Sequence, residues 1–250
     1  MHSYKKNDYI IVVPARFGSK RFKGKLLKKI NNFTVLELTI RQCLKFTTNK
    51  NIIVATDDAR IMSECKKINI SSILTSKKCQ TGTDRVAEVA RKIKRKFYIN
   101  VQADEIFVSP KAIKKAIDEI RKKGVGVVNC YTNILKKKEF YDLNVPKLII
   151  NKNNNLMYIS RSPIPQNKKG LFISAKKQVC VYAFKAQIIK KFYSKNSKKT
   201  DIEKFEDIEI LRLIENDIKV RMIKVKGSSL AIDTKKNLAD AKEILSCEYR

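Results

Sequence analysis

The order of short apolar runs constrains the fold of this 250-residue chain most strongly. Through the first half, runs rich in β-branched residues alternate with segments whose apolar residues recur at helical spacing. Strands that alternate with helices form βαβ units, so the pattern predicts a doubly wound, mostly parallel, Rossmann-like α/β sheet. The expected strands cover residues 10–13, 52–56, 70–74, 97–101 and 125–131, and the expected helices cover residues 34–45, 59–67, 83–94 and 110–122.

The rhythm changes after about residue 133. Two apolar runs, residues 147–150 and 156–160, flank an asparagine-rich segment, which predicts a β-hairpin. We therefore expect a single domain, residues 1–250, with an inserted β-rich lobe at about 133–200 that packs over the main sheet or dimerises beside it. Further expected elements are a strand at residues 179–184, a helix at 202–215, a strand at 218–225 and a closing helix at 236–245.

Histidine is nearly absent, and this excludes several kinds of catalysis. The single histidine, His2, lies in a segment that we expect to be a frayed terminus. Ser-His-Asp and Cys-His nucleophile systems, histidine-rich metal sites and histidine general bases are therefore excluded. Any catalysis must come from carboxylates, cations and a recruited metal ion.

The formal net charge of +31 raises the question of nucleic-acid binding. Lysine supplies 43 of the 55 basic residues, and the lysines are spread along the whole chain. A nucleic-acid surface is typically concentrated and richer in arginine and aromatic residues. We expect solvated surface lysines and no nucleic-acid partner, although the charge favours small polyanions such as nucleotides.

No apolar run approaches the roughly 20 residues of a membrane span. Residues 1–8 are polar, and the apolar stretch after them is too short for the apolar region of a secretory signal. We therefore expect a cytoplasmic protein with no membrane partner. The six cysteines show no C-x-x-C spacing, so we expect reduced thiols, without a zinc site or a disulfide framework.

The loop that follows the first strand has the chemistry of an anion site. Residues 14–25 read Pro-Ala-Arg-Phe-Gly-Ser-Lys-Arg-Phe-Lys-Gly-Lys, directly after the apolar run 9–13. Gly18 and Gly24 allow backbone amides to approach a phosphate. The loop matches neither a Walker A pattern nor G-x-G-x-x-G. Three of its cationic residues that can neutralise an anion are Arg16, Arg21 and Lys25.

Carboxylates follow apolar segments at two other places in the chain. Residues 100–105 read Asn-Val-Gln-Ala-Asp-Glu, and Asp233 ends an apolar segment before the last helix. Asp104 and Asp233 are hard oxygen donors that would suit Mg²⁺ if the sheet brings them together beside the loop. Helix capping by Asp104, Asp233 or Thr234 is the alternative explanation.

Polar residues also gather at residues 80–88 before an expected helix. Capping explains Thr83 and Asp84 without a ligand. It does not explain Gln80 and Arg85, which are placed to reach a nucleotide.

A row of acidic residues at a spacing of three occurs in the expected helix 202–215. Glu203, Glu206, Glu209 and Arg212 would share one face of a continuous helix. A solvated face is the usual explanation. In so lysine-rich a chain, the row is also suited to binding a polar sugar or sealing a dimer.

Together these segments resemble the cytidylyltransferases that activate 3-deoxy-manno-octulosonate (Kdo), relatives of the sialic-acid activators. The likeness covers nearly the whole chain, and the ordered set of motifs is more specific than any one of them. The segments that carry it are residues 14–25, 80–85, 100–105, Lys147 in its strand, residues 158–165 (Tyr-Ile-Ser-Arg-Ser-Pro-Ile-Pro), 203–212 and 232–234.

The resemblance implies a nucleotide-diphospho-sugar transferase type of fold and a Mg²⁺-dependent reaction. The anomeric hydroxyl of Kdo or a Kdo-like 2-keto-3-deoxy sugar acid would attack the α-phosphorus of CTP and release pyrophosphate, for lipopolysaccharide or cell-surface glycan synthesis. It also implies a homodimer. Such a transfer depends on positioning and charge neutralisation, so the lack of histidine is no obstacle.

The resemblance also implies roles for individual residues. The implied nucleotide-binding residues are Ala15, Arg16, Ser19, Arg21, Lys25, Gln80 and Arg85. The implied sugar-acid-binding residues are Gln102, Arg161, Gln178, Tyr182 and Glu206. The implied catalytic residues are Arg16, Lys25, Asp104 and Asp233, of which the two aspartates would bind Mg²⁺.

The chain departs from the family pattern mainly around the sugar site. Gln178 stands where the family usually has a histidine, and Cys180 and Ala183 replace glycines. Ala103 and Ile106 change the usual Gln-Gly-Asp-Glu-Pro motif. A glutamine is never cationic, so the alternative substrates are a sialic, pseudaminic, legionaminic or amino-substituted Kdo acid. A basic nucleic-acid-binding module without catalysis is the remote alternative.

Overall fold

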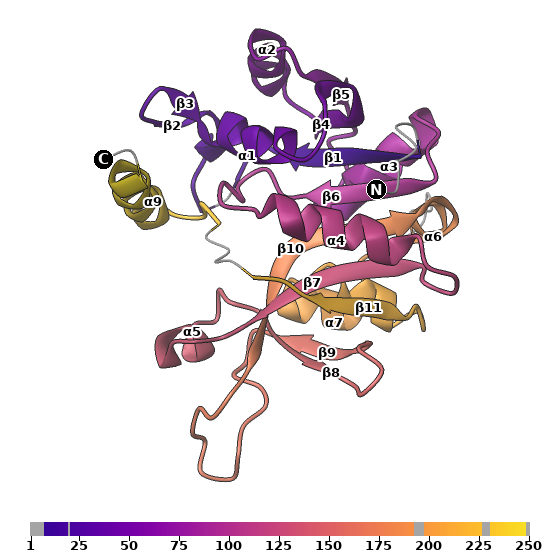
Figure 1. The fold of residues 1–250 in the computed structure, drawn as a ribbon, viewed down its shortest axis with the longest axis vertical. Helices are drawn as coiled ribbons and strands as arrows, with labels where there is room; N and C mark the ends of the chain where they lie inside the picture. The colour runs from indigo at the N-terminus through magenta and orange to yellow at the C-terminus, as the bar shows by residue number, and fades with distance from the viewer. Residues whose placement is uncertain (1–7, 20, 193–197, 227–230, 249–250) are drawn as a thin grey trace.

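The computed structural model describes residues 8–19, 21–192, 198–226 and 231–248. His2 therefore lies outside the described residues, as does the side chain of Cys247. Nine strands form one sheet, whose main path runs β11-β7-β10-β6-β1-β4-β5 (Figure 1).

The parallel half of the sheet is built around β1 (Tyr9–Ala15). All seven residues of β1 are buried, as expected for an apolar strand covered on both faces. β1 lies in parallel between β6 (Phe97–Val101) and β4 (Ile52–Thr56). β5 (Ser71–Leu74) completes this side of the sheet, so the predicted parallel arrangement is confirmed.

The other half contains the one reversed direction on the main path. β10 (Lys176–Lys185) runs antiparallel to both of its neighbours, β6 and β7 (Val127–Asn133). β11 (Val220–Lys224) then pairs in parallel with β7. The carboxyl ends of the parallel strands therefore share one edge, and the start of β10 lies beside them.

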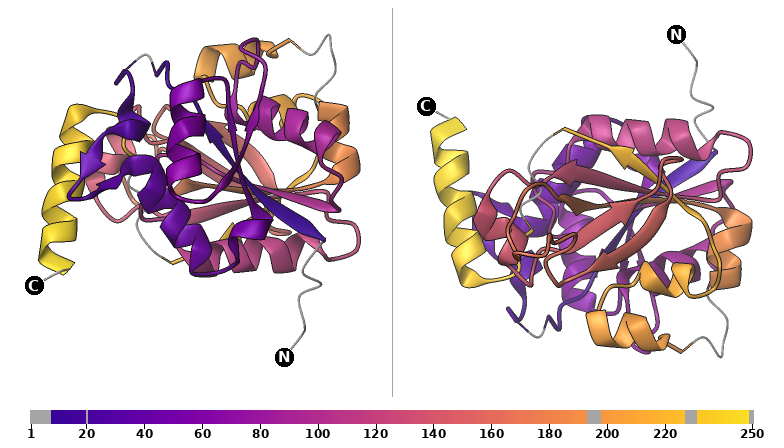
Figure 2. Two further views of the ribbon diagram at one scale, coloured as in Figure 1. Left: turned by 90° about the horizontal axis from the view of Figure 1, so that it is seen from above. Right: turned by 90° about the horizontal axis from the view of Figure 1, so that it is seen from below.

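Helices cover both faces of the sheet, because side chains alternate along the buried strands. On one face, Ile11 packs in a cluster that includes α1 (Val35–Leu44) and α4 (Pro110–Ile120). On the other face, Val12 packs in a cluster with α3 (Gly82–Lys92). Figure 2 shows helices on both sides of the twisted sheet, and the doubly wound prediction is confirmed.

Three further helices contribute to these two layers. α2 (Ala59–Lys67) and α9 (Lys235–Glu248) contribute to the α1–α4 face, and α6 (Ala186–Phe192) contributes to the α3 face. α5 (Lys137–Tyr141) lies apart from both and packs against Phe172 and Ala175, at the end of the loop that leads into β10. No helix of the described residues is long and apolar enough to cross a bilayer.

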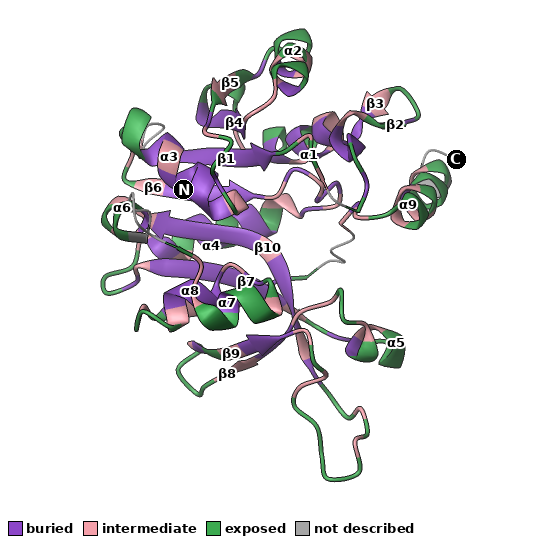
Figure 3. Ribbon diagram, turned by 180° about the vertical axis from the view of Figure 1, so that it is seen from behind, coloured by how far each residue is buried: buried purple, intermediate pink, exposed green. Residues whose placement is uncertain are grey.

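The expected lobe at residues 133–200 is only partly separate from the sheet. β8 (Lys147–Ile150) and β9 (Leu156–Ser160) form the predicted hairpin with the expected bounds. β10 falls within the same range, yet it is an interior strand of the main sheet. Figure 3 shows β10 buried, whereas the loop from β9 to β10 is largely exposed and extends away from the sheet.

The continuous helix predicted at residues 202–215 is wrong. The segment forms two short helices, α7 (Asp201–Glu206) and α8 (Leu211–Ile214). Asp207 ends α7 with a left-handed backbone, φ 48°, a conformation that aspartate adopts more readily than most residues. The acidic residues therefore do not share one helix face.

Several short elements carry too little periodicity to be predicted. They are the hairpin β2 (Lys29–Ile30) and β3 (Phe33–Thr34), the 3₁₀ turns η1 (Lys25–Leu27) and η2 (Asn49–Asn51), and the helices α5 and α6.

Candidate active site

Two neighbouring cavities open at the carboxyl ends of the parallel strands. The phosphate-loop cavity, about 640 Å³, is lined by the loop after β1 and by residues of α3 and the β6 end. The β10 cavity, about 580 Å³, is lined by β10 and the segment around Glu209. They form one continuous cleft, because both are lined by Arg21, Gln102, Asp104, Asn144, Arg161 and Asp207.

The loop after β1 folds back on itself at Phe17. The carbonyl oxygen of Phe17 accepts hydrogen bonds from the backbone N–H groups of Ser19 and Gly24, both at 3.0 Å. Gly24 has a left-handed backbone, φ 68°, so a side chain there would be strained. Arg16 donates from its guanidinium to the Cys79 carbonyl at 2.8 Å, which ties the loop to the residues before α3.

Most of the predicted nucleotide residues line the phosphate-loop cavity, among them Arg16, Ser19, Arg21, Lys25 and Gln80. Ala15 is the exception. It is the last residue of β1, is fully buried and does not line this cavity.

The predicted carboxylates meet at Lys25. The Lys25 Nζ lies 2.5 Å from Asp104 Oδ2 and 2.8 Å from Asp233 Oδ1. Arg21 adds a third ion pair, 2.9 Å from Asp233. Burial alone would disfavour the ammonium form, but the two carboxylates outweigh it, so the pKa of Lys25 is raised above its ordinary value.

This arrangement suits a hard divalent cation. One positively charged atom touches oxygens of both Asp104 and Asp233, so the two side chains converge on a single cation position. No group of three or more His, Cys, Asp and Glu side chains that could hold a metal occurs in the described part of the chain. Mg²⁺ commonly takes one or two carboxylates and completes its shell with phosphates and water, so the pair fits that ion.

The start of α3 is capped differently from our expectation. Thr81, not Thr83, is the N-cap, and it forms a capping box with Asp84. This geometry presents Gly82 to the cavity. A Cβ at Gly82 would lie 2.9 Å from the end of the Gln102 side chain, so a larger residue here would displace that side chain.

Arg85 also lies at the cavity wall, but its guanidinium is engaged within the protein. It pairs with Asp57 at 2.7 Å and donates to the Thr75 hydroxyl at 2.6 Å. The side chain is only 1% exposed. In this geometry Arg85 supports the wall of the cavity, and its guanidinium is bonded to these two protein partners.

Glu206 and Glu209, two acidic residues of the 203–212 segment, contact different parts of the protein. Glu206 binds the end of β9: it accepts from Ser160 Oγ at 2.5 Å and from the Arg161 N–H at 2.8 Å. It lines neither cavity, which corrects its expected place beside the sugar acid. Arg161 itself lines both cavities, and its Nε donates to the Glu206 carbonyl.

Glu209 is the carboxylate of this segment that lines the β10 cavity. It accepts from the Thr83 N–H at 3.0 Å and from Gln102 Nε2 at 3.4 Å. Desolvation raises its pKa above the ordinary value, although these hydrogen bonds act in the opposite direction. The acidic spacing pattern pointed to Glu209 only as one member of a row, because the helix break at Asp207 was not predicted.

The floor of the β10 cavity comes from β10 itself. Gln178 and Tyr182, both expected at the sugar site, line it. Gln178 Nε2 donates to Asn129 Oδ1 at 3.1 Å, and Asn129 Nδ2 in turn donates to the carbonyls of Val179 and Val181 at the β10 irregularity. Burial raises the pKa of Tyr182 well above its ordinary value.

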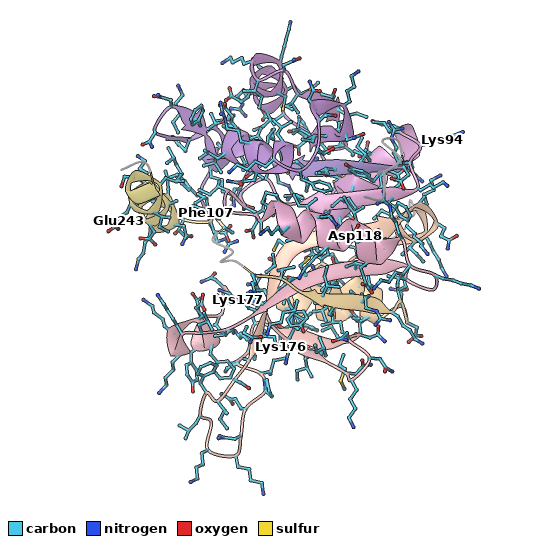
Figure 4. The ribbon with its side chains drawn as sticks, in the orientation of Figure 1. Lys94, Phe107, Asp118, Lys176, Lys177 and Glu243 are labelled. Carbon is cyan, nitrogen blue, oxygen red and sulfur yellow. The ribbon has the colours of Figure 1, made fainter. Side chains whose placement is uncertain are left out.

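Lys177 is a cavity residue that the motifs did not indicate. It pairs with Glu139 of α5 at 2.5 Å. Figure 4 labels Lys177 on the same side of the molecule as Phe107, which follows β6, whereas Lys94 lies at the opposite end of the sheet. Asn144 and Asp207 are further lining residues that we did not predict.

Comparisons with known proteins agree on one family. A family model described as cytidylyltransferase matches residues 10–222. The 3-deoxy-manno-octulosonate cytidylyltransferase of Fusobacterium nucleatum is 33% identical over 232 residues, covering 92% of this chain and 94% of that protein. The enzyme of the same name from Trichlorobacter lovleyi is 32% identical, with 94% and 97% coverage.

Solved structures support the same conclusion. A structure described as CMP:2-keto-3-deoxy-manno-octonic acid synthetase complexed with CTP superposes with a TM-score of 0.87 at 28% identity, covering 96% of this chain and 99% of that one. A cytidylyltransferase from Leptospira borgpetersenii shares only the fold, with a TM-score of 0.65 at 14% identity. The chain is thus an enzyme, not a binding module without catalysis, and it belongs to the cytidylyltransferase family, among the 3-deoxy-manno-octulosonate cytidylyltransferases.

Proposed function

We propose that the enzyme transfers CMP from CTP to the anomeric hydroxyl of Kdo or a Kdo-like 2-keto-3-deoxy sugar acid and releases pyrophosphate. One observation carries this proposal. Asp104 and Asp233, 129 positions apart in the chain, converge on the Lys25 ammonium beside the loop that follows β1. A phosphate-binding loop next to a paired carboxylate site is the arrangement that nucleotidyl transfer requires.

The cations of the loop would bind the triphosphate. Arg16, Ser19 and Lys25 all line the phosphate-loop cavity, and Lys25 lies between the two carboxylates. The backbone hydrogen bonds to the Phe17 carbonyl hold this loop in one conformation. The loop therefore loses little conformational entropy when the anion binds. Gly82 and Gln80, at the start of α3, would line the nucleoside side of the cavity.

Asp104 and Asp233 would hold Mg²⁺, with the triphosphate supplying further oxygen ligands. When bound, this ion would neutralise phosphate charge and favour ionisation of the attacking hydroxyl. The chain's own contribution is to aim both carboxylates at one point. Lys25 pairs with Asp104 and Asp233, and Arg21 pairs with Asp233.

The sugar acid would occupy the β10 cavity, next to the α-phosphate of CTP. Arg161 and Lys177 are cations that line this cavity and suit a carboxylate. Gln102 is shared between the two cavities, so it lies where the two substrates meet.

A second substrate class, a sialic, pseudaminic, legionaminic or amino-substituted Kdo acid, is favoured by one observation. Gln178 presents a neutral amide to the β10 cavity where the family usually has a histidine. We propose Kdo first because the named relatives are called 3-deoxy-manno-octulosonate cytidylyltransferases and match this chain over nearly their full length.

Pyrophosphate release from CTP with a panel of these sugar acids, with and without Mg²⁺, tests the proposal. Replacing Asp104 with Asn should lower kcat with the best acid by about a hundredfold or more, because it removes one arm of the carboxylate pair. Asp118→Asn, a change at a half-exposed carboxylate of α4, is the control and should retain activity (Figure 4). Near-normal turnover of D104N, with folding verified by circular dichroism, would contradict the assignment.

We also propose a cytoplasmic homodimer that serves lipopolysaccharide or cell-surface glycan synthesis. The β8–β9 hairpin and the loop after it expose large apolar side chains, including Met157 at 56% and Ile173 at 74%. Such a surface is suited to association of two copies. Light scattering of the purified protein distinguishes a dimer from a monomer.

A further inference from the structure

The ring of Phe17 lies at the junction between the phosphate loop and α2. The guanidinium carbon of Arg60 lies 3.4 Å from the centroid of this ring, a cation–π contact. A Cβ at Gly24 would lie 3.1 Å from Phe17 Cζ, so the ring also packs directly against the far end of the loop. One aromatic side chain therefore touches both the loop and the neighbouring helix.

Arg60 is held in place by the first residue before its own helix. Asp58 caps α2 and accepts from the Arg60 N–H at 2.9 Å. The same carboxylate accepts from Arg60 Nε at 2.9 Å and from a terminal nitrogen at 2.6 Å. These hydrogen bonds from Arg60 lower the pKa of Asp58, so the pair stays ionised at neutral pH. The guanidinium is consequently held over the ring, although its side chain remains 60% exposed.

The backbone of Phe17 completes the connection. Its carbonyl binds the N–H groups of Ser19 and Gly24, and the residue after Gly24 is Lys25. A contact that fixes Phe17 therefore fixes the spacing between Arg16 and Lys25, the two cations that flank the loop.

We propose that Arg60 and Phe17 form a clamp by which the start of α2 holds the phosphate loop in its CTP-binding shape. Both are positioning residues, since they act through Arg16, Ser19 and Lys25. Neither Phe17 nor Arg60 is among the residues that line the phosphate-loop cavity. The proposal rests on the function proposed above, in which this loop binds the triphosphate.

The clamp makes a specific kinetic prediction. If the loop is misplaced in part of the free enzyme, only the remaining fraction of molecules can bind CTP. The apparent Kd for CTP then equals the intrinsic Kd divided by that fraction, while the bound complexes react normally. Arg60→Ala should therefore raise the KM for CTP about two- to fivefold, the effect expected for one exposed cation–π contact, and change kcat and the KM for the sugar acid little.

Variants of Phe17 separate the ring's π-face from its bulk. Phe17→Leu keeps an apolar side chain without a cation–π partner, so it should raise the CTP KM at least as much as R60A. Phe17→Tyr keeps the aromatic face and should restore near-normal KM. The double variant R60A/F17L should be no worse than F17L, because both changes remove the same contact.

The chain offers a matched control at a second cation–π contact. Arg41 lies 3.9 Å from the Phe33 centroid and pairs with Glu37, and its side chain is about as exposed as that of Arg60, 51% against 60%. This contact joins α1 to β3, away from the loop. Arg41→Ala should leave the KM for CTP unchanged.

Limited trypsin digestion gives a readout that does not depend on turnover. The loop carries cleavable residues at Arg21 and Lys23, so mass spectrometry of the fragments reports loop opening. R60A and F17L should be cut there several times faster than the wild type and R41A, and CTP should slow the cutting.

The outcomes separate the two proposals. Equal CTP KM values and equal cleavage rates for R60A and wild type would overturn the clamp, whatever the substrate. If R41A raised the KM for CTP as much as R60A does, the clamp would also be overturned, because the effect would then not depend on contact with Phe17. A wild-type enzyme that releases no pyrophosphate from CTP would overturn the proposed function, and the cleavage rates would still decide whether the clamp exists.

Discussion

Arg212 is buried between three elements, and its removal should destabilise the fold strongly. Its Nε and one terminal nitrogen donate to Glu203 at 2.6 and 2.7 Å, and the other terminal nitrogen donates to Asp84 at 2.9 Å. The side chains of Arg212, Asp84 and Glu203 are 4%, 6% and 0% exposed. Arg212→Met would leave two buried carboxylates without their cation.

Breaking a buried charge pair in this way costs about 3–5 kcal/mol of unfolding free energy. At about 2–4 °C per kcal/mol for a chain of this size, the melting temperature should fall by about 6–20 °C. Urea unfolding followed by circular dichroism measures the change. Lys114→Met, which removes an exposed pair with Asp118 on α4, should cost less than about 0.5 kcal/mol.

The double variant R212M/E203Q sharpens the test. It removes one of the two uncompensated charges, so it should be more stable than R212M alone. A loss below about 1 kcal/mol for R212M, or a double variant less stable than the single one, would refute the electrostatic reasoning.

Three further predictions concern the stability effect of Glu209, the reactivity of two buried cysteines and the binding of Mg²⁺ by a Lys25 variant. Because desolvation raises the folded-state pKa of Glu209, its charged form costs stability above its unfolded pKa of about 4.3, so Glu209→Gln should be more stable than wild type at pH 7 and equal to it near pH 4 in urea unfolding. Cys43 and Cys130 are fully buried, and burial raises the pKa of Cys43 to about 12, so iodoacetamide at pH 7.5 should modify neither thiol before denaturant is added. Lys25→Met leaves Asp104 and Asp233 close together without their ammonium, so Mg²⁺ should raise the melting temperature of this variant more than that of the wild type; an equal rise would contradict the shared cation position.

Local patterns predicted the elements that depend on short-range sequence. The strands at residues 52–56 and 97–101 have the expected bounds because continuous apolar runs fit a sheet buried on both faces. The loop after β1 was indicated by its glycines and cations. Asp104 was indicated by its place after a predicted strand, and Asp233 by its place between an apolar segment and the last helix. Each of these features is recognised from residues that are close together in the sequence.

The prediction was wrong where contacts between residues far apart in the sequence determine the local structure. The helix at residues 202–215 was expected to be continuous, because the apolar spacing continues through Asp207. In the fold, Glu206 binds the end of β9, Glu209 binds the start of α3 and Arg212 reaches Asp84, three partners that no single helix face could serve. These contacts favour the break over an unbroken helix.

The sequence by itself determined the parallel sheet, the cationic loop and the kinds of side chain available for catalysis, because periodicity and residue chemistry are local properties. Only the tertiary structure decided that Asp104 and Asp233 share one cation position, that Arg85 supports a wall, and that Glu209 rather than Glu206 faces the cleft. Burial and charge pairing depend on which elements meet, and that depends on the packing of the whole chain.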